Sequence, residues 1–322
     1  MSPPQVSYVV ALYNHERFIA ALMGSIREQD FEDLEAIVVD DGSTDGSLQR
    51  AREAVGEDRR FRLLTQPNRG VVAARNRGLA EARGEFVSVV DSDDLLPGDR
   101  TRRLVEALQG RPGASMAYGD AWIIDADNRR QARFWEIYPP QPGDLSQALF
   151  LHYCFVPAVS VMVRRSPFEA SGPFWGPGAN TDYLKWIELG LFGEAVRLTG
   201  EPLGCWRWHG ANVSQPLLSA RIEQYHRLRE GLAELLQRRP ELAARLPERL
   251  VRRRYGRCHL MAGFYAGVEG QWAMARREFA ASFNYERHWL ASGAWISTWP
   301  PINRISQALY AGLARRRLRQ PA

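Results

Sequence analysis

Three carboxylates, Asp91, Asp93 and Asp94, follow directly on a run of β-branched residues in the stretch VVDSDDLLPG. Like charges this close together repel one another, so a buried site built from them calls for a positive partner. Carboxylate oxygens in an Asp-x-Asp arrangement at the end of a strand suit a hard divalent cation such as Mg²⁺ or Mn²⁺. The alternative is a capped turn before a helix over residues 99–109, with Asp94 or Asp99 as the cap.

A second acidic pair, Asp40 and Asp41, lies in the stretch VVDDGSTDGS. One of these carboxylates would accept hydrogen bonds from a nucleobase or a ribose; the alternative is that Asp40 caps local backbone while Asp41 is solvated. The sequence contains neither a G-x-G-x-x-G loop after its first apolar run nor a G-x-x-x-x-G-K-[ST] loop. Dinucleotide oxidoreductases and P-loop enzymes are therefore disfavoured.

The acidic pairs end two of four short apolar runs, which the sequence predicts to be strands. The runs cover residues 6–12, 34–40, 61–65 and 85–91. Continuous β-branched runs of this kind are typical of parallel strands buried on both faces. Polar loops follow them (YNHE, DDGSTDGS, QPNRG and DSDD), and in an open α/β sheet such loops meet beyond the carboxyl ends of the strands.

Helical patterns separate these runs, as a doubly wound α/β sheet requires. The first helix carries an apolar stripe through Phe18, Ile19, Leu22 and Ile26; the second contains Leu48, Ala51 and Val55, with Ser43 or Thr44 as N-cap; the third covers residues 72–82, with Gly84 at its C′ position.

The pattern changes after about residue 112. Strands are predicted within residues 115–125, 134–139 and 158–165, and helices over 145–153 and 180–193. From Pro216 the chain becomes helical and rich in arginine. Helices are predicted over 221–238 and 249–284, with breaks near Pro240, Pro247 and Gly270, and an amphipathic helix over 302–319. We therefore predict a catalytic domain over residues 1–214 and an α-helical region over residues 215–322.

Composition and charge narrow the class of protein. The chain has 322 residues, 45% of them hydrophobic, and no apolar stretch long enough for a membrane span or a signal peptide. Its three scattered cysteines suggest buried thiols in a reducing compartment. Residues 215–322 carry 19 arginines and 8 acidic residues, whereas residues 1–214 carry 23 basic and 29 acidic residues. Nucleic-acid-binding modules are not visible, so we expect no nucleic-acid partner.

Two long blocks closely resemble the family 2 glycosyltransferases, which have a GT-A fold. They are VSYVVALYNHERFIAALMGSIREQDFEDLEAIVVDDGSTDGS and QPNRGVVAARNRGLAEARGEFVSVVDSDDLLPGDR, and they include the YN opening, the VDDGSTDGS block and an Asp-x-Asp motif in register. The stretches GANTDYLKWIEL and WRWHGANVS are similar to the acidic helix start and the closing element of the family. The resemblance runs over about residues 5–214 and implies a Rossmann-like open mixed sheet with helices on both faces.

The resemblance also implies an inverting transfer of one sugar from a nucleotide-diphosphate sugar, expected to be UDP-linked, to an acceptor hydroxyl. It implies that Asp41 reads the base and that Asp91 contacts the ribose or the metal. The residues expected to bind the nucleotide sugar are Ala11, Tyr13, Asp41, Asn68, Gly70, Arg75, Asp91 and Ser92. The residues expected to hold Mg²⁺ or Mn²⁺ are Asp93, Asp91 and His209; a structural role for the histidine is the alternative.

An inverting transfer needs a general base that deprotonates the acceptor, and Asp182 matches the base of the family. The family mostly has Glu-Asp at this point, where this chain has Thr181-Asp182. The alternative for Asp182 is charge complementarity with a helix N-terminus. Trp206 and Arg207 are candidate contacts to the acceptor or a phosphate. The Q-x-x-R-W element of processive synthases is missing, so the sequence favours addition of a single sugar.

Two rival functions use the same residues differently. A non-catalytic nucleotide-sugar-binding partner protein of the same fold would not need Asp182, and a nucleotidyltransferase would carry a basic glycine-rich loop that this chain lacks. A bacterial surface-polysaccharide or lipopolysaccharide pathway would place the enzyme in the cytoplasm with a glycan or lipid-linked acceptor. The basic last helix would then contact the cytoplasmic face of the inner membrane, or the helical region would form a homodimer.

Overall fold

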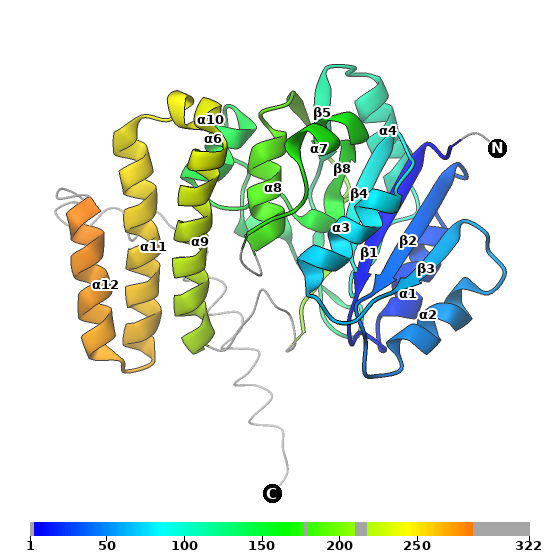
Figure 1. Ribbon diagram of the computed structural model, residues 1–322, viewed down its shortest axis with the longest axis horizontal. Coiled ribbons are helices and arrows are strands. Elements are labelled where there is room, and N and C mark those ends of the chain that lie inside the picture. Colours follow the sequence, from blue (N-terminus) through cyan, green and yellow to red (C-terminus); the bar gives the residue numbers. More distant parts are fainter. Residues whose placement is uncertain (1–2, 177–179, 210–217, 286–322) are drawn as a thin grey trace, which may run out of the picture.

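The computed structural model describes residues 3–176, 180–209 and 218–285. An α/β sheet region occupies one end of the molecule, and long helices from the C-terminal part stand side by side at the other end (Figure 1). The boundary predicted at residue 214 falls within residues 210–217, and the helix predicted over 302–319 falls within residues 286–322. Both lie outside the described residues.

A seven-stranded mixed sheet forms the centre of the α/β region, in the order β3-β2-β1-β4-β8-β5-β9. Its strands are β1 Val6–Leu12, β2 Leu34–Asp40, β3 Phe61–Thr65, β4 Phe86–Asp91, β5 Ala114–Tyr118, β8 Val161–Arg164 and β9 Glu194–Arg197. The first four strands pair in parallel, as predicted, while β8 runs antiparallel to both β4 and β5. The predicted GT-A-like sheet is confirmed.

The register of these strands brings the acidic residues to one edge of the sheet. Ala11 of β1 pairs with Val39 of β2 on one side and with Asp91 of β4 on the other. Leu12 pairs with Asp40. Because parallel strands end together at their carboxyl ends, the loops after β1, β2 and β4 must lie next to one another.

Helices cover both faces of the sheet, which explains the continuous apolar runs. Val9 and Val89 belong to the core on the side of α3 (Val71–Glu81) and α8 (Thr181–Leu189). Tyr8 and Val10 face the opposite core, with α1 (Ile19–Arg27) and α4 (Arg100–Gln109). The other helices of this region are α2 Ser47–Val55, α6 Leu145–Leu151 and α7 Arg165–Ser171, with a 3₁₀ turn at Ala158–Ser160.

A second, three-stranded sheet closes the region, in the order β10-β6-β7. Its strands are β6 Trp122–Ile124, β7 Arg130–Arg133 and β10 Cys205–Arg207. The strand predicted over 134–139 is wrong, because Phe134–Ile137 forms the short helix α5. The Asp120 carboxylate accepts a hydrogen bond from the backbone N–H of Trp135, and Glu136 accepts one from Arg133. These contacts hold a helical turn where the aromatic composition predicted a strand.

Two predicted helix ends are also wrong. The N-cap of α2 is Gly46, and its N–H donates to the Glu16 carboxylate, so neither Ser43 nor Thr44 caps the helix. The last residue of α3 is Glu81 and its C-cap is Ala82, so Gly84 lies beyond the C′ position. A Cβ at Gly84 would stand 2.6 Å from the backbone nitrogen of Ser7, so glycine is needed there for close packing on β1.

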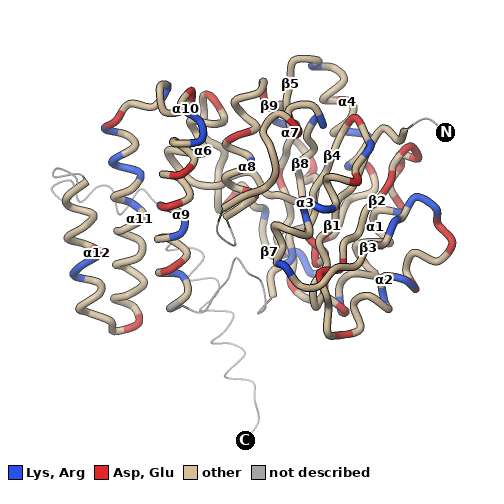
Figure 2. Tube along the Cα trace, viewed as in Figure 1, with Lys and Arg blue, Asp and Glu red and all other residues tan. Residues whose placement is uncertain are grey.

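The C-terminal region contains α9 Leu218–Arg238, α10 Pro240–Arg245, α11 Glu248–Val268 and α12 Trp272–Tyr285. The predicted breaks near Pro240, Pro247 and Gly270 are confirmed, although the segment between the two prolines forms a short helix of its own. Arginine is concentrated along α11 (Figure 2). Within the described ranges, every helix is too short or too polar to span a bilayer.

Candidate active site

The loop after β4 presents its three carboxylates in different environments. The backbone turns at once, since the N–H of Asp94 donates to the carbonyl of Asp91. The Asp91 side chain is 38% exposed, whereas the Asp93 side chain is 8% exposed and Asp94 is buried. Burial raises the pKa of Asp94 well above its usual range, and the neighbouring charges of Asp93 and Asp91 raise it further. The three carboxyl groups of this loop therefore lie close enough together to disfavour ionisation of the buried one.

Arg207 braces this loop through several hydrogen bonds, a role that the sequence did not predict. The side chain is 1% exposed, and its guanidinium donates to the backbone carbonyls of Asp93 and Asp125. Its own backbone N–H donates to the Asp94 carboxylate over 2.9 Å. The guanidinium also lies over the Phe18 ring. Arg207 therefore links β10 to the acidic loop and to the turn at Asp125; its predicted contact with an acceptor or a phosphate stays a prediction.

Trp206 lies among aromatic residues of the second sheet. Its ring packs edge-on against Phe134 and Trp208, and it borders the core on the α1 side of the main sheet. The side chain is partly exposed. An acceptor contact through the exposed part of this ring stays a prediction.

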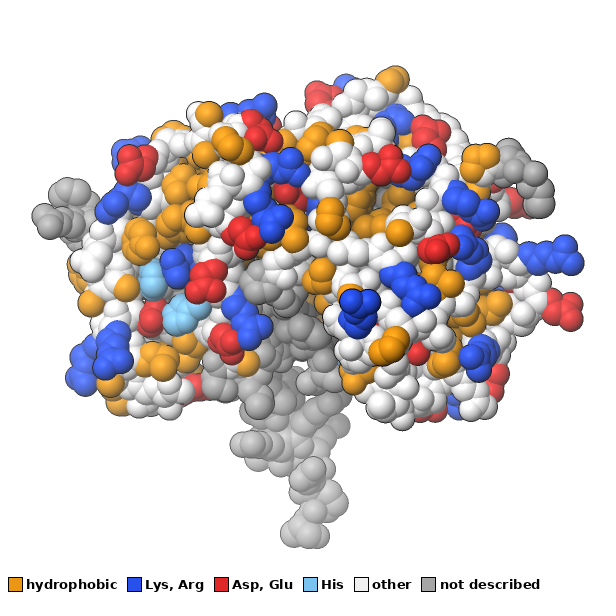
Figure 3. All heavy atoms as spheres, in the orientation of Figure 1, with side chains coloured by type: hydrophobic (Ala, Val, Ile, Leu, Met, Phe, Trp, Pro, Cys, Tyr) orange, Lys and Arg blue, Asp and Glu red, His pale blue; other side chains and the backbone are white. Residues whose placement is uncertain are grey.

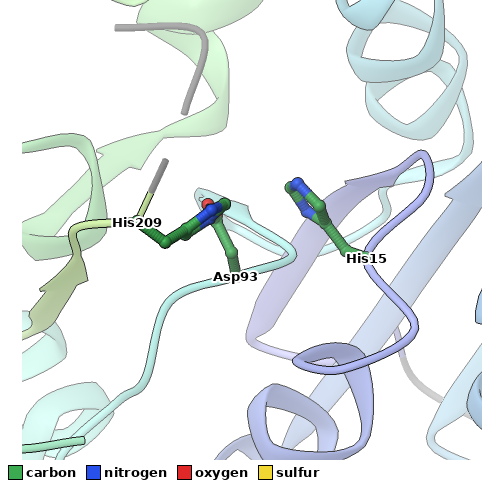
Figure 4. Close-up of side chains that lie close together, drawn as sticks. All are labelled: His15, Asp93 and His209. Carbon is green, nitrogen blue, oxygen red and sulfur yellow. The ribbon is translucent and has the colours of Figure 1, made fainter. Parts of the chain in front are cut away.

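His209 and Asp93 form the centre of a cluster with metal-ligating atoms (Figure 4). His209 Nε2 lies 2.9 Å from Asp93 Oδ2. His15, from the loop after β1, contributes a third ligand atom, and all three atoms lie within 4.8 Å of one another. His15 Nδ1 also lies 2.7 Å from Ser92 Oγ. The residues predicted from distant parts of the chain are therefore brought together.

His15 was not predicted as a site residue. The sequence signal was present, because the YNHE loop follows the first strand at the carboxyl edge of the sheet. A single histidine in a polar loop does not reveal that it faces Asp93, however. The ring of His15 meets that of His209 edge-on at 5.9 Å, and Phe18 packs on His209 at 4.8 Å. These contacts fix both imidazoles beside the acidic loop.

The donor atoms of this cluster fit a divalent cation. Asp93 supplies a carboxylate oxygen, the donor that Mg²⁺ and Mn²⁺ prefer, and the two imidazoles supply nitrogen. Asp91, two residues away and more exposed, supplies a further carboxylate at the rim. Burial raises the pKa of Asp94, the charges of Asp93 and Asp91 raise it further, and a cation beside them would offset this repulsion.

Arg75 connects the acidic loop to the start of α8. Its guanidinium donates to Asp91 over 2.6 Å and to the Thr181 hydroxyl over 3.1 Å. Burial alone would lower the pKa of Arg75, but the charges of Asp91 and Asp182 outweigh it and hold the pKa above its usual value. Thr181, which stands where the family resemblance led us to expect Glu, therefore accepts a hydrogen bond from Arg75.

Asp182 sits in the first turn of α8 beside this arginine. Burial raises its pKa above the usual value; the Arg75 charge opposes this shift, and the Asp91 charge adds to it. The residue is still partly exposed. A carboxylate whose pKa is moved toward neutrality and that keeps access to solvent suits proton abstraction.

Asp41 is buried and fully engaged with the loop after β3, so it is not solvated. Its carboxylate accepts hydrogen bonds from the side chain of Gln66 over 2.7 Å and from the backbone N–H groups of Arg69 and Gly70 over 2.9 and 2.8 Å. Gly70 is the N-cap of α3 with φ +87°, a conformation that favours glycine. Asp41 thus fixes the loop that also carries Asn68; base recognition stays a prediction.

The remaining predicted nucleotide contacts line the same edge of the sheet. Tyr13 is 43% exposed, Ala11 is partly buried at the end of β1, and Asn68 is exposed. The Asn68 side chain accepts a hydrogen bond from the Gly70 N–H. Asp40 accepts weakly from the Ser43 N–H, as its capping alternative predicted.

The comparisons with known proteins agree with this arrangement. The model of the family Glycosyl transferase family 2 matches residues 7–172. The chain belongs to glycosyl transferase family 2. The Bacillus subtilis (strain 168) protein EpsH, which carries a glycosyltransferase name, is 30% identical over 247 residues, covering 75% of this chain and 72% of EpsH. The succinoglycan biosynthesis protein ExoO of Rhizobium meliloti is 37% identical over 134 residues, 41% of this chain and 38% of ExoO.

Solved structures share the fold of this family 2 glycosyltransferase. The Pyrobaculum calidifontis mannosyltransferase PcManGT, in complex with GDP-Man and Mn²⁺, aligns over 95% of this chain and 84% of its own, with a TM-score of 0.60 and 20% identity. S. aureus TarS 1–349, in complex with UDP-GlcNAc, aligns over 89% of this chain and 92% of its own, with a TM-score of 0.57 and 17% identity.

Proposed function

We propose that this family 2 glycosyltransferase is an inverting enzyme that moves one sugar from a nucleotide-diphosphate sugar to an acceptor hydroxyl. The observation that carries the proposal is the meeting of Asp93, His209 and His15 at the carboxyl edge of the sheet. Asp91 of the same loop is linked through Arg75 to Thr181, the first residue of the helix whose first turn contains Asp182. A candidate cation-binding group and a candidate base are thus connected at one edge.

Asp93 and His209 would hold a divalent ion, with Asp91 at the rim. The bound ion would stabilise the negative charge that develops on the nucleotide-diphosphate leaving group, an effect worth several kcal/mol. The chain's own part is to fix the ligands: Ser92 and Phe18 orient His15 and His209, and Arg207 braces the backbone at Asp93.

Asp182 would act as the general base toward the acceptor hydroxyl. Arg75 hydrogen-bonds to Asp91 and to Thr181 at the start of α8, so its charge offsets the repulsion between Asp91 and Asp182. The raised pKa of Asp182 makes it a stronger proton acceptor than an ordinary aspartate, which contributes to a rate effect of about 10²–10⁴-fold for general-base catalysis.

The nucleotide would lie over the loops after β1, β2 and β3. Tyr13 and Ala11 would line the base pocket, and the loop fastened by Asp41 would close on the nucleotide through Asn68 and Gly70. Because PcManGT carries GDP-Man and TarS carries UDP-GlcNAc, the fold accepts different nucleotides, and UDP stays the proposal for this chain.

We place the enzyme in the assembly of a bacterial surface polysaccharide or lipopolysaccharide. ExoO is named for succinoglycan biosynthesis, which supports a glycan or lipid-linked acceptor. The arginine-rich C-terminal region would then support peripheral contact with the cytoplasmic face of the inner membrane, or a homodimer.

The test is a hydrolysis and transfer assay on the purified full chain. UDP-, GDP- and dTDP-sugars are supplied with Mn²⁺ or Mg²⁺, and released nucleotide is measured beside Asp93→Ala and Asp182→Asn. Asp99→Asn is the matched control, because this carboxylate lies at the start of α4, where it pairs with Arg103. We expect metal-dependent release from one donor that Asp93→Ala removes and the control retains. Binding of none of these nucleotides would refute the proposal.

A further inference from the structure

A second group of metal-ligating side chains meets in the C-terminal helical region. It consists of His226 on α9, His259 on α11 and Glu278 on α12, and we call it the helical triad. His226 Nε2 lies 3.0 Å and His259 Nδ1 lies 2.8 Å from the same atom, Glu278 Oε2. All three ligand atoms lie within 4.8 Å of one another.

The helical triad differs from an ordinary surface ion pair. Two imidazoles from separate helices converge on one carboxylate oxygen, whereas an ordinary ion pair joins one cationic and one anionic side chain. The side chains of His259 and Glu278 are each 14% exposed, while that of His226 is 34% exposed. Histidine side chains reach the surface on this part of the molecule (Figure 3). His259 and Glu278 are thus largely buried, while His226 is the most exposed of the three side chains.

The ring of His259 is fixed by its neighbours. It stacks on Tyr285 with the centroids 5.5 Å apart and the planes 20° from parallel. The His226 ring lies 6.1 Å away. A ligand that is already oriented loses little conformational freedom on binding, so the arrangement favours tight metal binding.

We propose that the helical triad is a binding site for a divalent transition-metal ion, and that its ligand chemistry suits Zn²⁺. Two imidazole nitrogens and one carboxylate oxygen match the three-ligand zinc sites of proteins, which leave a fourth position for water. We expect this fourth position to lie beside His226, the most exposed of the three side chains. Mg²⁺ is disfavoured because it prefers a shell made mainly of oxygen.

The distances are close to those that a zinc ion requires. Tetrahedral coordination at about 2.0–2.2 Å puts neighbouring ligand atoms about 3.3 Å apart. The observed separations of 2.8 and 3.0 Å are hydrogen-bond distances, so the ion would take the place of the shared protons after an opening of a few tenths of an ångström. The more exposed His226 side chain has room for this adjustment.

The consequence of binding is a cross-link between α9, α11 and α12. In Figure 1, α11 stands between α9 and α12. One small apolar cluster in these helices consists of Ile222, Ala262, Ala266 and Ala275, with Tyr225 and Tyr265 at its edge. A metal ion that binds only the folded state would add to the stability that this packing provides.

The experiment titrates the full chain with Zn²⁺ by calorimetry in an Asp93→Ala background. This background removes Asp93, the carboxylate that lies within the other histidine cluster, and so weakens competing binding there. We expect one Zn²⁺ per chain and a higher melting temperature with the ion. Co²⁺ serves as a second probe, since a tetrahedral site gives it visible absorption. Absence of stoichiometric binding would overturn the proposal.

Variants in the same background assign the ligands. Removal of a direct ligand, in Glu278→Gln or His226→Gln, is expected to weaken Zn²⁺ binding more than the roughly 10–100-fold effect of an outer ligand partner. His152→Gln, outside both clusters, is the matched control and should bind normally. If Glu278→Gln does not fold, the more exposed His226→Gln decides. Unchanged affinity and Co²⁺ absorption in His226→Gln would overturn the assignment.

Discussion

The molecule brings two imidazoles and a carboxylate together twice, in very different surroundings. His15, Asp93 and His209 come from loops and strand ends at the edge of the main sheet, with further carboxylates in the same loop. The helical triad comes from three helices and contains one carboxylate, Glu278. The same donor types therefore meet once on loops and once on rigid elements.

The pKa of a buried carboxyl group is shifted in opposite directions in the two clusters. At the sheet edge, burial and the charges of Asp93 and Asp91 raise the pKa of Asp94. In the helical triad, burial would also raise the pKa of Glu278, but the hydrogen bonds from His259 and His226 outweigh it and the pKa is lowered. Burial and the neighbouring carboxylates thus raise the pKa of the buried carboxyl group at the sheet edge, whereas the two histidines of the helical triad outweigh burial and lower that of Glu278. The first cluster lies at a sheet edge with further acidic groups beside it, and the second lies between helices.

The largest effect should come from the candidate base. Asp182→Asn keeps the shape of the side chain but removes its ability to accept a proton, so we expect kcat to fall by about 10²–10⁴-fold with little change in KM. Steady-state kinetics with an identified donor and acceptor measure this. A normal kcat of Asp182→Asn would mean that the acidic groups at this edge bind ligands but do not abstract the proton.

The pH profile of the same enzyme provides an internal check. Asp182 is active when deprotonated, and its pKa is raised, so the rate should be lost on acidification at a higher pH than for an ordinary aspartate near 3.9. The residual rate of Asp182→Asn should lack this acidic limb. An unchanged limb in the variant would assign the titration to another group.

Loss of Asp93, the carboxylate proposed to bind the metal, should have the next largest effect. We expect Asp93→Ala to lower kcat by about 10²–10³-fold, the size found when one electrostatic stabiliser of a transition state is removed. The variant should also require more Mn²⁺ for half-maximal activity. Glu278→Gln is the matched change in the helical triad and should leave the Mn²⁺ requirement as it is; an equal shift in both variants would contradict the division of roles.

A third change tests the support beneath the acidic loop. Arg207→Ala leaves buried carbonyls of Asp93 and Asp125 without their donor, so we expect the free energy of unfolding to fall by about 3 kcal/mol. Arg17→Ala is the control, because Arg17 donates to the neighbouring carbonyl of Ala126 but is 62% exposed, and its loss should cost about 0.5 kcal/mol. Urea unfolding measures both. A raised KM of Arg207→Ala with unchanged stability would instead support the predicted contact of Arg207 with an acceptor or a phosphate.

The smallest effect should come from the buried carboxyl group of Asp94. Because the folded-state pKa of Asp94 is raised, the folded protein holds more protons than the unfolded chain, and stability falls as the pH rises from the unfolded pKa toward the folded one. Asp94→Asn removes this penalty and can still accept from the Arg207 N–H. The metal-free variant should melt above the wild type at neutral pH, with the difference shrinking toward acid. A lower melting temperature at neutral pH would show that the charge is already balanced.

Much of the sheet could be predicted from local pattern, and the candidate site from local pattern together with the family resemblance. The four parallel strands matched because their β-branched runs are buried on both faces. Asp41 and Asp93 were singled out because they follow strands at the carboxyl edge, whereas the role of Asp182 came from the resemblance; all three roles stay predictions. The segment 134–139 was misassigned because its aromatic residues favour a strand, while Trp135 donates a hydrogen bond to Asp120, fifteen residues earlier. The burial of Arg207 was not predicted, because a basic residue near an acidic motif gives no sign of it.

The sequence by itself determined the layered α/β region, the edge at which the site lies and the family to which the chain belongs, since strand period, loop composition and motifs are local properties. Only the tertiary structure decided which histidine faces which carboxylate. His15 reaches Asp93 across 78 positions of sequence, and His226 reaches Glu278 across three helices, because packing brings them within hydrogen-bond distance. Spacing along a chain does not encode such meetings; they follow from the way the buried surfaces of sheet and helices fit together.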